Sequence, residues 1–485
     1  MEPPVAQVVK DSQSRGRADY LWHPEIGAPF PLDRHPGKST RMKTILLIGA
    51  GRSSAHLIRY LVEHAGAENW HIRIGDLDVE GTRHRTGHAG CTEVFSLDAS
   101  HAEDRRGAMA EADLIISMLP ASMHVEVARD CIALKKDVIT PSYVADEMWP
   151  LDKEAREAGI LILNEMGVDP GIDHMSAMKL IDGIRARGGR VKSFESYTGG
   201  LVAPESDTNP WHYKVTWNPR NVVLAGSGGT ARYRHAGMLK YIPYPQLFSR
   251  VTPVDVPGYG RFEGYANRDS LKYLDVYGLQ GVDTLLRGTL RKDGFCSAWQ
   301  ALVELGLTDD TFAIPDAAVQ SWRMLTASFA PITSSSRLEQ DLAQAFGWSH
   351  EVLERLVWLG IFEDRPLGIS SGSPAAALQR LIEEKWKLSP GDKDLLVMWH
   401  RFVAEEGGSR YELTSWLTTE GEDPIYTAMS RTVGLPIGIA ARRILRGEWH
   451  MKGIVLPVIP EIYLPVLDEL ESFGITFRES ISPLD

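Results

Sequence analysis

Short apolar runs alternate with helical patterns over the first third of the chain. A continuous run such as Thr44–Ile48 is typical of a strand that is covered on both faces of a parallel sheet. The runs that we interpret as strands are 44–48, 71–74, 114–120, 138–140 and 160–163. Segments with helical spacing of apolar residues lie between them, at 57–62, 125–133 and 146–158. This alternation predicts an α/β fold with a doubly wound, Rossmann-type parallel sheet.

The pattern changes after a helix that begins near Met175. Residues 191–197 alternate as in a strand, and the polar stretch 199–213 is interpreted as a lid or specificity loop. The later segments are a helical stretch at 297–386, strands at 393–416, an apolar helix at 426–445, and a last helix and strand at 462–477. We expect the helical stretch to be an inserted domain and the apolar helix to pack back on the first sheet.

Residues 1–41 show no periodicity and are rich in Pro, Arg, Asp and His. Such a composition is typical of a disordered extension. Met42 stands directly before the first strand, so we expect the natural start there. The alternative is a short arm that packs on a partner subunit.

A Gly-rich turn joins the first strand to the first helix. Gly49 permits the tight turn, Gly51 lets the backbone approach a pyrophosphate, and the helix N-terminus supplies N–H groups. Ser54 replaces the third glycine of the dinucleotide fingerprint, so the turn alone is a weak signal. Asp76 ends the next strand at the spacing of a ribose-binding carboxylate. These features predict NAD or NADP as the cofactor.

Asp76 also bears on the choice between the two cofactors. Its carboxylate would accept hydrogen bonds from the ribose hydroxyls and repel a 2′-phosphate, which favours NAD. Arg83 and Arg85 lie close by in the sequence and could reverse that preference. The alternative role for Asp76 is a helix cap.

The segment Asn164–His174 lies between a strand and a helix and carries three acidic residues, a proline and two glycines. Asp169 sits at the start of the predicted helix, where it is either a cap or a carboxylate for a substrate ammonium and a proton. Tyr143 follows another strand end and is either packed or free to orient a substrate carboxylate. We take Asp169 and Tyr143 as the candidate catalytic residues.

Two arginines in separate turns suit an anionic substrate. Arg268 and Arg291 follow strand-like segments, and a guanidinium binds a carboxylate through two parallel hydrogen bonds. The alternative is a structural ion pair with Asp269 or Glu263.

Composition and charge exclude several classes. The 485 residues are 43% hydrophobic and carry a formal net charge of −12, which argues against binding to nucleic acid or to an anionic membrane. No apolar run approaches the roughly 18 residues of a membrane span. Three cysteines without metal or disulfide spacing favour a cytoplasmic protein, and we expect no metal site.

The ordered motifs resemble those of the saccharopine dehydrogenase (glutamate-forming) family, also called saccharopine reductase. The matching stretches are 116–120, 142–144, 164–174, 199–201 with 203–206, 267–270, 287–291, and 428–429 with 433–436. They extend over nearly the whole chain after the first 41 residues.

The resemblance implies a homodimer of three-domain chains that oxidises saccharopine with NAD(P)+. The expected domains are a Rossmann domain at 42–165 completed by about 420–453, a mixed α/β substrate and dimerisation domain at 166–296 with about 390–419 and 454–485, and a helical insertion at 297–389. The residues that would contact saccharopine are Ser142, Tyr143, Asp169, Arg268, Thr289, Leu290 and Arg291. Those that would contact the cofactor, besides Gly49, are Gly51, Arg52, Ser53, Asp76, Asp98, Ala99, Leu119 and Val168.

The sequence departs from the family pattern at two places. Arg52 and Ser53 replace the usual aromatic or aliphatic residues, and Thr198 stands where fungal and animal members usually have Cys. Chemistry that depends on a cysteine cannot operate at that position. Two other functions stay open: a carboxynorspermidine-type dehydrogenase acting on a polyamine imine, and a dinucleotide-sensing protein without catalysis.

Overall fold

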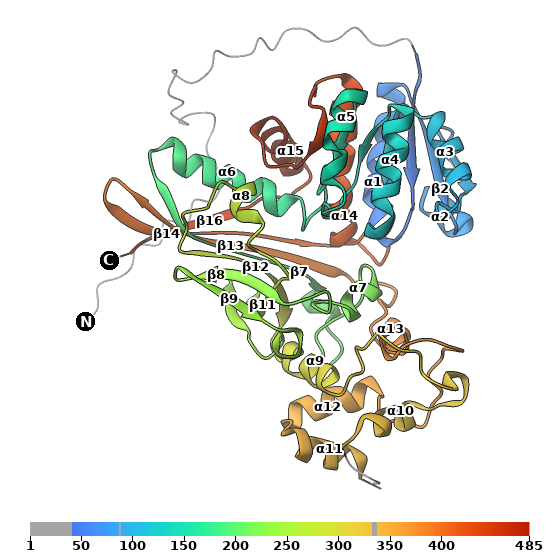
Figure 1. Ribbon diagram of the computed structural model, residues 1–485, viewed down its shortest axis with the longest axis vertical. Helices are drawn as coiled ribbons and strands as arrows, with labels where there is room; N and C mark the ends of the chain where they lie inside the picture. The colour runs from blue at the N-terminus through green and yellow to red at the C-terminus, as the bar shows by residue number, and fades with distance from the viewer. Residues whose placement is uncertain (1–40, 87–88, 332–336, 485) are drawn as a thin grey trace.

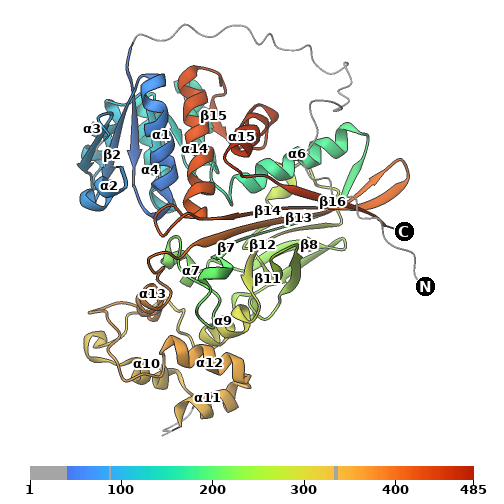
Figure 2. The same ribbon diagram turned by 180° about the vertical axis from the view of Figure 1, so that it is seen from behind.

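The structure is a computed structural model that describes residues 41–86, 89–331 and 337–484 (Figure 1). It contains two large sheets, and helices α6 (Ile172–Ala186), α14 (Ala428–Arg446) and α15 (Pro460–Ser472) lie in the core between them. A further group of helices lies beyond the second sheet (Figures 1 and 2). The expected extension at 1–41 falls almost entirely outside the described residues. Among the described helices, none is long and apolar enough to cross a membrane.

The first sheet has seven parallel strands in the order β15-β6-β5-β4-β1-β2-β3. The strands are β1 (Lys43–Ile48), β2 (Trp70–Asp76), β3 (Thr92–Ser96), β4 (Leu114–Ser117), β5 (Asp137–Ile139), β6 (Leu161–Leu163) and β15 (Gly453–Val455). The chain order reverses between β1 and β4, and ligands of such sheets bind beyond the strand ends at this point. The predicted α/β class and the doubly wound sheet are confirmed.

Helices cover both faces of this sheet (Figures 1 and 2). They are α1 (Ala55–Glu68), α2 (Val79–Thr86), α3 (Ala102–Ala110), α4 (His124–Leu134), α5 (Asp152–Ala158) and α14. Helix α15 packs on α14 and α6. The helix expected at 146–158 begins later, because a 3-10 turn occupies Trp149–Leu151.

Helix α14 packs directly on α1, as the apolar pattern at 426–445 predicts. Two glycines one turn apart make the close approach possible. A Cβ at Gly434 would lie 2.6 Å from the Leu57 nitrogen, and one at Gly438 would lie 2.5 Å from the Tyr60 ring. The C-terminal part of the chain thus packs on the half of the fold that contains the first sheet.

The second sheet is mixed and has nine strands. Its main path is β10-β11-β12-β7-β13-β14-β16, with the hairpin β8–β9 beside β12. The strands are β7 (Arg190–Val202), β8 (Ala231–His235), β9 (Met238–Ile242), β10 (Thr252–Val256), β11 (Gly260–Ala266), β12 (Thr284–Lys292), β13 (Asp394–Glu406), β14 (Ser409–Glu420) and β16 (Arg478–Leu484). Among the described strand pairs, β7–β12 is parallel and the other pairs of this sheet are antiparallel. Helices α6 (Ile172–Ala186) and α8 (Tyr273–Val276) lie on the face toward the first sheet (Figure 1).

The remaining helices form the group beyond the second sheet (Figure 1). They are α7 (Pro219–Val223), α9 (Phe295–Glu304), α10 (Trp322–Phe329), α11 (Leu338–Phe346), α12 (His350–Leu359) and α13 (Pro374–Lys385). Aromatic rings join them to the segment that follows β7. Trp211 of this segment packs edge-on against Phe295 and Trp299 of α9 and against Trp386 after α13.

The stretch expected as a loop at 199–213 is different in the structure. Strand β7 continues through Val202, so the expectation is wrong for residues 199–202. The two glycines are needed in the strand because neighbours crowd them: a Cβ at Gly199 would lie 2.8 Å from the Leu290 oxygen. Trp211 and Tyr213 are fully buried, which contradicts a mobile lid.

Candidate functional site

The Gly-rich turn lies at the carboxyl end of β1. Gly49 has a φ of +86°, and a Cβ there would lie 3.2 Å from the Met118 carbonyl, so only glycine fits this turn. A Cβ at Gly51, in contrast, would meet no atom within 4 Å. The N-terminus of α1 therefore faces open space beside Gly51, as binding of a pyrophosphate requires. Arg52 and Ser53 form the short 3-10 turn before the helix.

Asp76 ends β2, and its carboxylate is bound to the same turn. One oxygen accepts from the Ala50 N–H at 2.5 Å, and the other accepts from the Asp78 N–H at 2.7 Å. The cap of α2 is Asp78, which accepts from the Gly81 N–H at 2.9 Å. The helix-cap alternative for Asp76 is therefore wrong, and its carboxylate instead joins the strand end to the Gly-rich turn.

The other predicted cofactor residues lie along neighbouring strand ends. Leu119 follows β4, and its backbone nitrogen would be 3.5 Å from a Cβ at Gly49. Asp98 follows β3 and accepts from the Ser100 hydroxyl at 2.6 Å and the Ser100 N–H at 2.9 Å, which lower the pKa of Asp98. The Ala99 carbonyl accepts from Arg105. These residues border the crevice where a dinucleotide would lie.

The segment from Asn164 to His174 folds into a tight turn between β6 and α6. A Cβ at Gly171 would lie 2.0 Å from the Gly167 oxygen, and Gly171 has a φ of +147°. The Asp169–Pro170 peptide bond is cis. This compact turn places Asp169 at the start of α6, next to Val168, at the join between the two sheets.

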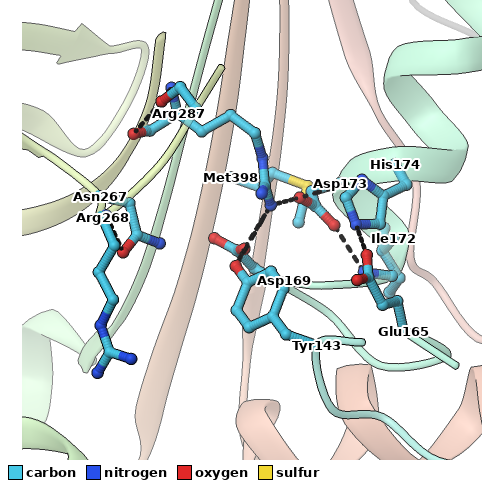
Figure 3. Close-up of polar contacts among 12 residues, drawn as sticks. Tyr143, Glu165, Asp169, Ile172, Asp173, His174, Asn267, Arg268, Arg287 and Met398 are labelled. Atoms are coloured by element: carbon cyan, nitrogen blue, oxygen red, sulfur yellow. Dashed lines mark hydrogen bonds and ion pairs between the residues drawn. The ribbon is translucent and has the colours of Figure 1, made fainter. Parts of the chain in front are cut away.

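Asp169 is the centre of a polar cluster from three elements (Figure 3). The Tyr143 hydroxyl donates to Asp169 Oδ1 at 2.6 Å. The Arg287 guanidinium, from β12, donates to the same oxygen at 2.8 Å and also pairs with Asp173 of α6. The Tyr143 hydroxyl lies 3.4 Å from Arg287. Asp169 and Tyr143, which the sequence suggested separately, are thus in direct contact.

The two aspartates of the cluster differ in how readily they ionise, because their pKa values shift in opposite directions. Burial, and then the negative charge of Asp173, raise the pKa of Asp169. Burial also acts to raise the pKa of Asp173, but His174, Arg287 and the Gly171 N–H outweigh it and lower this pKa. Asp169 is therefore the carboxyl group that more readily carries a proton.

Glu165 and His174 form a second buried contact behind this cluster. His174 Nε2 lies 2.7 Å from Glu165 Oε2, and Nδ1 lies 2.6 Å from the Tyr277 hydroxyl. Glu165 also accepts from the Val144 N–H at 3.0 Å. These contacts connect the loop that carries Tyr143 to the helix that carries Asp173.

Ser142 is held by a buried histidine. His124 Nε2 lies 2.9 Å from the Ser142 hydroxyl and 3.1 Å from that of Thr140, and Nδ1 lies 3.2 Å from that of Ser117. Burial lowers the pKa of His124 to about 4, so the ring is neutral at ordinary pH. It links the ends of β4 and β5 at the mouth of the crevice.

Arg291 lies within β12 and not in a turn, which corrects the expectation from the sequence. It is 3% exposed, and its guanidinium lies 5.1 Å from the Tyr213 ring centre and 5.3 Å from that of Phe295. Its Nη1 donates to the Leu290 carbonyl at 2.9 Å. Within the described part of the chain, no carboxylate pairs with Arg291 and its buried Nε has no hydrogen-bond partner. Glu263 instead accepts from the N–H groups of Gly294 and Cys296.

Arg268 lies in the turn after β11 and is exposed. Its guanidinium extends away from that of Arg287 (Figure 3). Asp269, the alternative partner, pairs with Arg232 at 2.6 Å. The structural ion pairs considered for Arg268 and Arg291 are therefore wrong.

Thr289 and Thr198 are register partners on β12 and β7. The Thr198 hydroxyl is buried and has no hydrogen-bond partner among the described residues. Leu290 is fully buried and crowds Gly199, so its side chain is not accessible to a substrate.

Sequence reasoning missed Arg287, Asp173 and His124. One available signal is the spacing of Arg287, Thr289 and Arg291, because alternate residues of a strand share one face. The pairing of Arg287 with Asp173 of α6 joins residues that are far apart in the sequence, so no local sequence pattern predicts it.

Comparisons with known proteins agree with this arrangement. Residues 45–163 match a family model described as the saccharopine dehydrogenase NADP binding domain, and residues 167–475 match the saccharopine dehydrogenase C-terminal domain. The chain belongs to the saccharopine dehydrogenase family. The resemblance drawn from the motifs is thereby confirmed.

Individual relatives extend over most of the chain. The saccharopine dehydrogenase [NADP(+), L-glutamate-forming] of Pyricularia oryzae is 34% identical over 90% of this chain and 99% of its own length. The mitochondrial alpha-aminoadipic semialdehyde synthase of Bos taurus is 35% identical, and this chain spans only 47% of its length. The structure of the apo glutamate-forming enzyme from Saccharomyces cerevisiae matches with a TM-score of 0.80 at 31% identity, over 91% of this chain and 100% of that one.

Proposed function

We propose that the protein oxidises the secondary amine of saccharopine with NAD(P)+ and releases glutamate and 2-aminoadipate 6-semialdehyde, or catalyses the reverse reduction in lysine metabolism. The observation that carries the proposal is the state of two arginines. Arg268 and Arg291 have no carboxylate partner within the described residues. Arg268 is exposed, whereas Arg291 is buried with one bond to the Leu290 carbonyl, and a buried guanidinium without a counter-charge is costly. Saccharopine has three carboxylates that would pair with such groups.

The Gly-rich turn, Asp76, Asp98, Leu119 and Val168 would hold the dinucleotide. Bound NAD(P)+ would accept the hydride that leaves the carbon beside the amine. Asp76 favours NAD, because its carboxylate at the end of β2 would repel a 2′-phosphate.

Asp169 is the residue that we assign to proton transfer. The amine must lose a proton so that its lone pair can form the C=N bond as the C–H bond breaks. Water then adds to the imine carbon and loses one proton, which gives a carbinolamine. Its nitrogen takes a proton, the C–N bond breaks as the hydroxyl gives up its proton to become the aldehyde C=O, and the nitrogen leaves as the amino group of glutamate. A carboxyl group with a raised pKa suits both transfers, and the Tyr143 hydroxyl orients it from 2.6 Å.

The carboxynorspermidine-type alternative would use a more cationic substrate. A homospermidine synthase structure from Legionella pneumophila shares the fold at 12% identity with a TM-score of 0.50, which bears on the fold alone. The unpaired Arg291 favours an anionic substrate over a polyamine. A dinucleotide sensor would not need the cluster of Tyr143, Asp169 and Arg287.

An absorbance assay tests the proposal. The purified protein is mixed with saccharopine and either NAD+ or NADP+, and formation of the reduced cofactor is followed. We expect saccharopine to be oxidised and a carboxyalkyl polyamine to be inert. Oxidation of the polyamine with no reaction of saccharopine would contradict the proposal. No reaction with either substrate, together with tight cofactor binding, would favour the sensor.

We also propose a cytoplasmic homodimer. Met238, Leu239 and Tyr241 on β9 are each at least half exposed, and contiguous exposed apolar residues are typical of protein interfaces. Light scattering should give twice the chain mass of 53.9 kDa. A Leu239→Lys variant should reduce the mass to that of one chain.

A further inference from the structure

The Arg287 guanidinium joins two carboxylates that differ in access. The same nitrogen, Nη2, donates to Asp169 Oδ1 at 2.8 Å and to Asp173 Oδ2 (Figure 3). The Asp169 side chain is 17% exposed, whereas those of Arg287 and Asp173 are 5% and 1% exposed. A substrate can therefore reach Asp169, but it cannot reach Asp173.

The two carboxylates also differ in the donors that stabilise their charge. Asp173 accepts from the Gly171 N–H at 2.6 Å, and His174 Nδ1 lies 3.8 Å away. Asp169 has the Tyr143 hydroxyl besides the shared guanidinium. One guanidinium balances one negative charge, and two carboxylates that share a site cannot both ionise easily. These contacts stabilise a negative charge on Asp173 more than one on Asp169.

We propose that Asp173 is a positioning residue that holds Arg287 and, by keeping the negative charge of the pair, makes Asp169 the group that exchanges protons. The proposal rests on the proposed function only for the identity of the substrate. The charge distribution between the two aspartates is a property of the free protein. Asp173 acts through Arg287 and Asp169 and never touches the substrate.

Among the other groups around the cluster, His174 favours ionised Asp173, so it acts in the same direction as Arg287. The neighbours on other elements are Tyr143, Tyr273 and Tyr277, Glu165 with His174, and His400 on β13. Burial raises the pKa of each of the three tyrosines, so they stay neutral. Burial lowers the pKa of His400 to about 4, so it is neutral too. Glu165 and His174 are paired with each other at 2.7 Å.

Asp173→Asn gives a prediction with a definite sign. The asparagine oxygen can still accept from the Gly171 N–H, so the start of α6 keeps that bond. The variant removes the negative charge that raises the pKa of Asp169, and it leaves Arg287 to Asp169 alone. Both changes favour ionised Asp169, so its pKa should fall by about one unit or more. Arg287→Gln should have the opposite effect, because two carboxylates would then share the site without a cation.

The test is an infrared titration of the protonated carboxyl band in the free full-length protein, without substrate or cofactor. Asp169→Asn identifies the band by removing it. We expect the midpoint to move down in Asp173→Asn and up in Arg287→Gln. Asp182→Asn is the matched control, since Asp182 lies on the same helix and pairs with Arg185 and Tyr463 away from the cluster. An unchanged midpoint in a folded Asp173→Asn variant would overturn the proposal.

A second readout uses catalysis. If saccharopine is the substrate, the acidic limb of the pH profile of kcat/KM should move to lower pH in Asp173→Asn by the same amount as the infrared midpoint. A purely structural role for Asp173 would lower activity at every pH without moving the limb, which would also overturn the proposal. Absence of saccharopine oxidation by the unaltered protein would refute the proposed function and leave the infrared result to decide this one.

Discussion

Substitution of Arg291 by Met separates substrate binding from stability. Arg291 is 3% exposed and is surrounded by the rings of Tyr213, Tyr265 and Phe295. If a saccharopine carboxylate pairs with this buried guanidinium, loss of the pair costs about 3 kcal/mol or more. That energy corresponds to a rise in KM of roughly 100-fold or more.

The same substitution weakens substrate binding but should make the free protein more stable. A buried guanidinium without a carboxylate is destabilising by several kcal/mol, of which contacts with aromatic faces recover about 0.5–2 kcal/mol each. Met is unbranched and flexible like Arg, although shorter, and has no charge to desolvate. We expect Arg291→Met to stabilise the free protein by about 1 kcal/mol. Because the entropy of unfolding scales with chain length, its Tm should rise by about 1 °C.

The assay combines thermal unfolding of the free protein with steady-state kinetics for saccharopine. Arg261→Met is the control, because Arg261 lies on the neighbouring strand β11 and forms an exposed pair with Asp255. This control should leave KM unchanged and shift Tm little, since exposed pairs contribute about 0–1 kcal/mol. An unchanged KM together with a lower Tm in Arg291→Met would show that Arg291 only packs the core, and would refute the reasoning.

Three further changes test other parts of the structure. The pKa of His124 falls from 6.5 to about 4 on folding. Between these two pH values the unfolded chain binds a proton that the folded chain lacks, so the free energy of unfolding falls as pH drops from 6.5 to about 4. The loss reaches on the order of 3 kcal/mol at about pH 4. Urea unfolding at pH 7 and pH 4 should therefore show a smaller acid loss in His124→Gln, and an equal loss would contradict the assignment. Asp76→Asn should narrow any preference for NAD+ over NADP+ in comparative kinetics, and an unchanged ratio would remove Asp76 from the ribose site. Gly171→Ala would place a Cβ 2.0 Å from the Gly167 oxygen at a φ of +147°, so it should abolish activity and lower Tm, whereas normal kinetics would show that the turn adapts.

The first sheet was predictable because its strands are buried on both faces. Runs such as Ile45–Ile48 are continuously apolar, and every one of these residues is buried in the structure. The turn at Gly49 and the carboxylate of Asp76 follow such runs directly, so the local sequence indicates their place. Asp169 and Tyr143 also follow strand ends, and the resemblance to a family then added Ser142, Thr289 and Leu290 to the expected substrate contacts.

The contacts that complete the site were not predictable from local patterns. Arg287 is 114 residues from Asp173 in sequence. They meet because β12 pairs with β7, and α6 packs on β7. The strand at Gly199 was missed because paired glycines usually indicate a turn. Here they relieve crowding, since a Cβ at Gly200 would lie 2.4 Å from the Met429 side chain. Such crowding depends on elements far apart in the chain.

The identity of the products tests the central claim most directly. The protein is incubated with saccharopine and NAD+ or NADP+, and the products are identified by mass spectrometry. The predicted products are glutamate and 2-aminoadipate 6-semialdehyde, in amounts equal to that of the reduced cofactor. Asp169→Asn should suppress the formation of both amino-acid products and of the reduced cofactor. Formation of lysine and 2-oxoglutarate, or no product from saccharopine at all, would contradict the account.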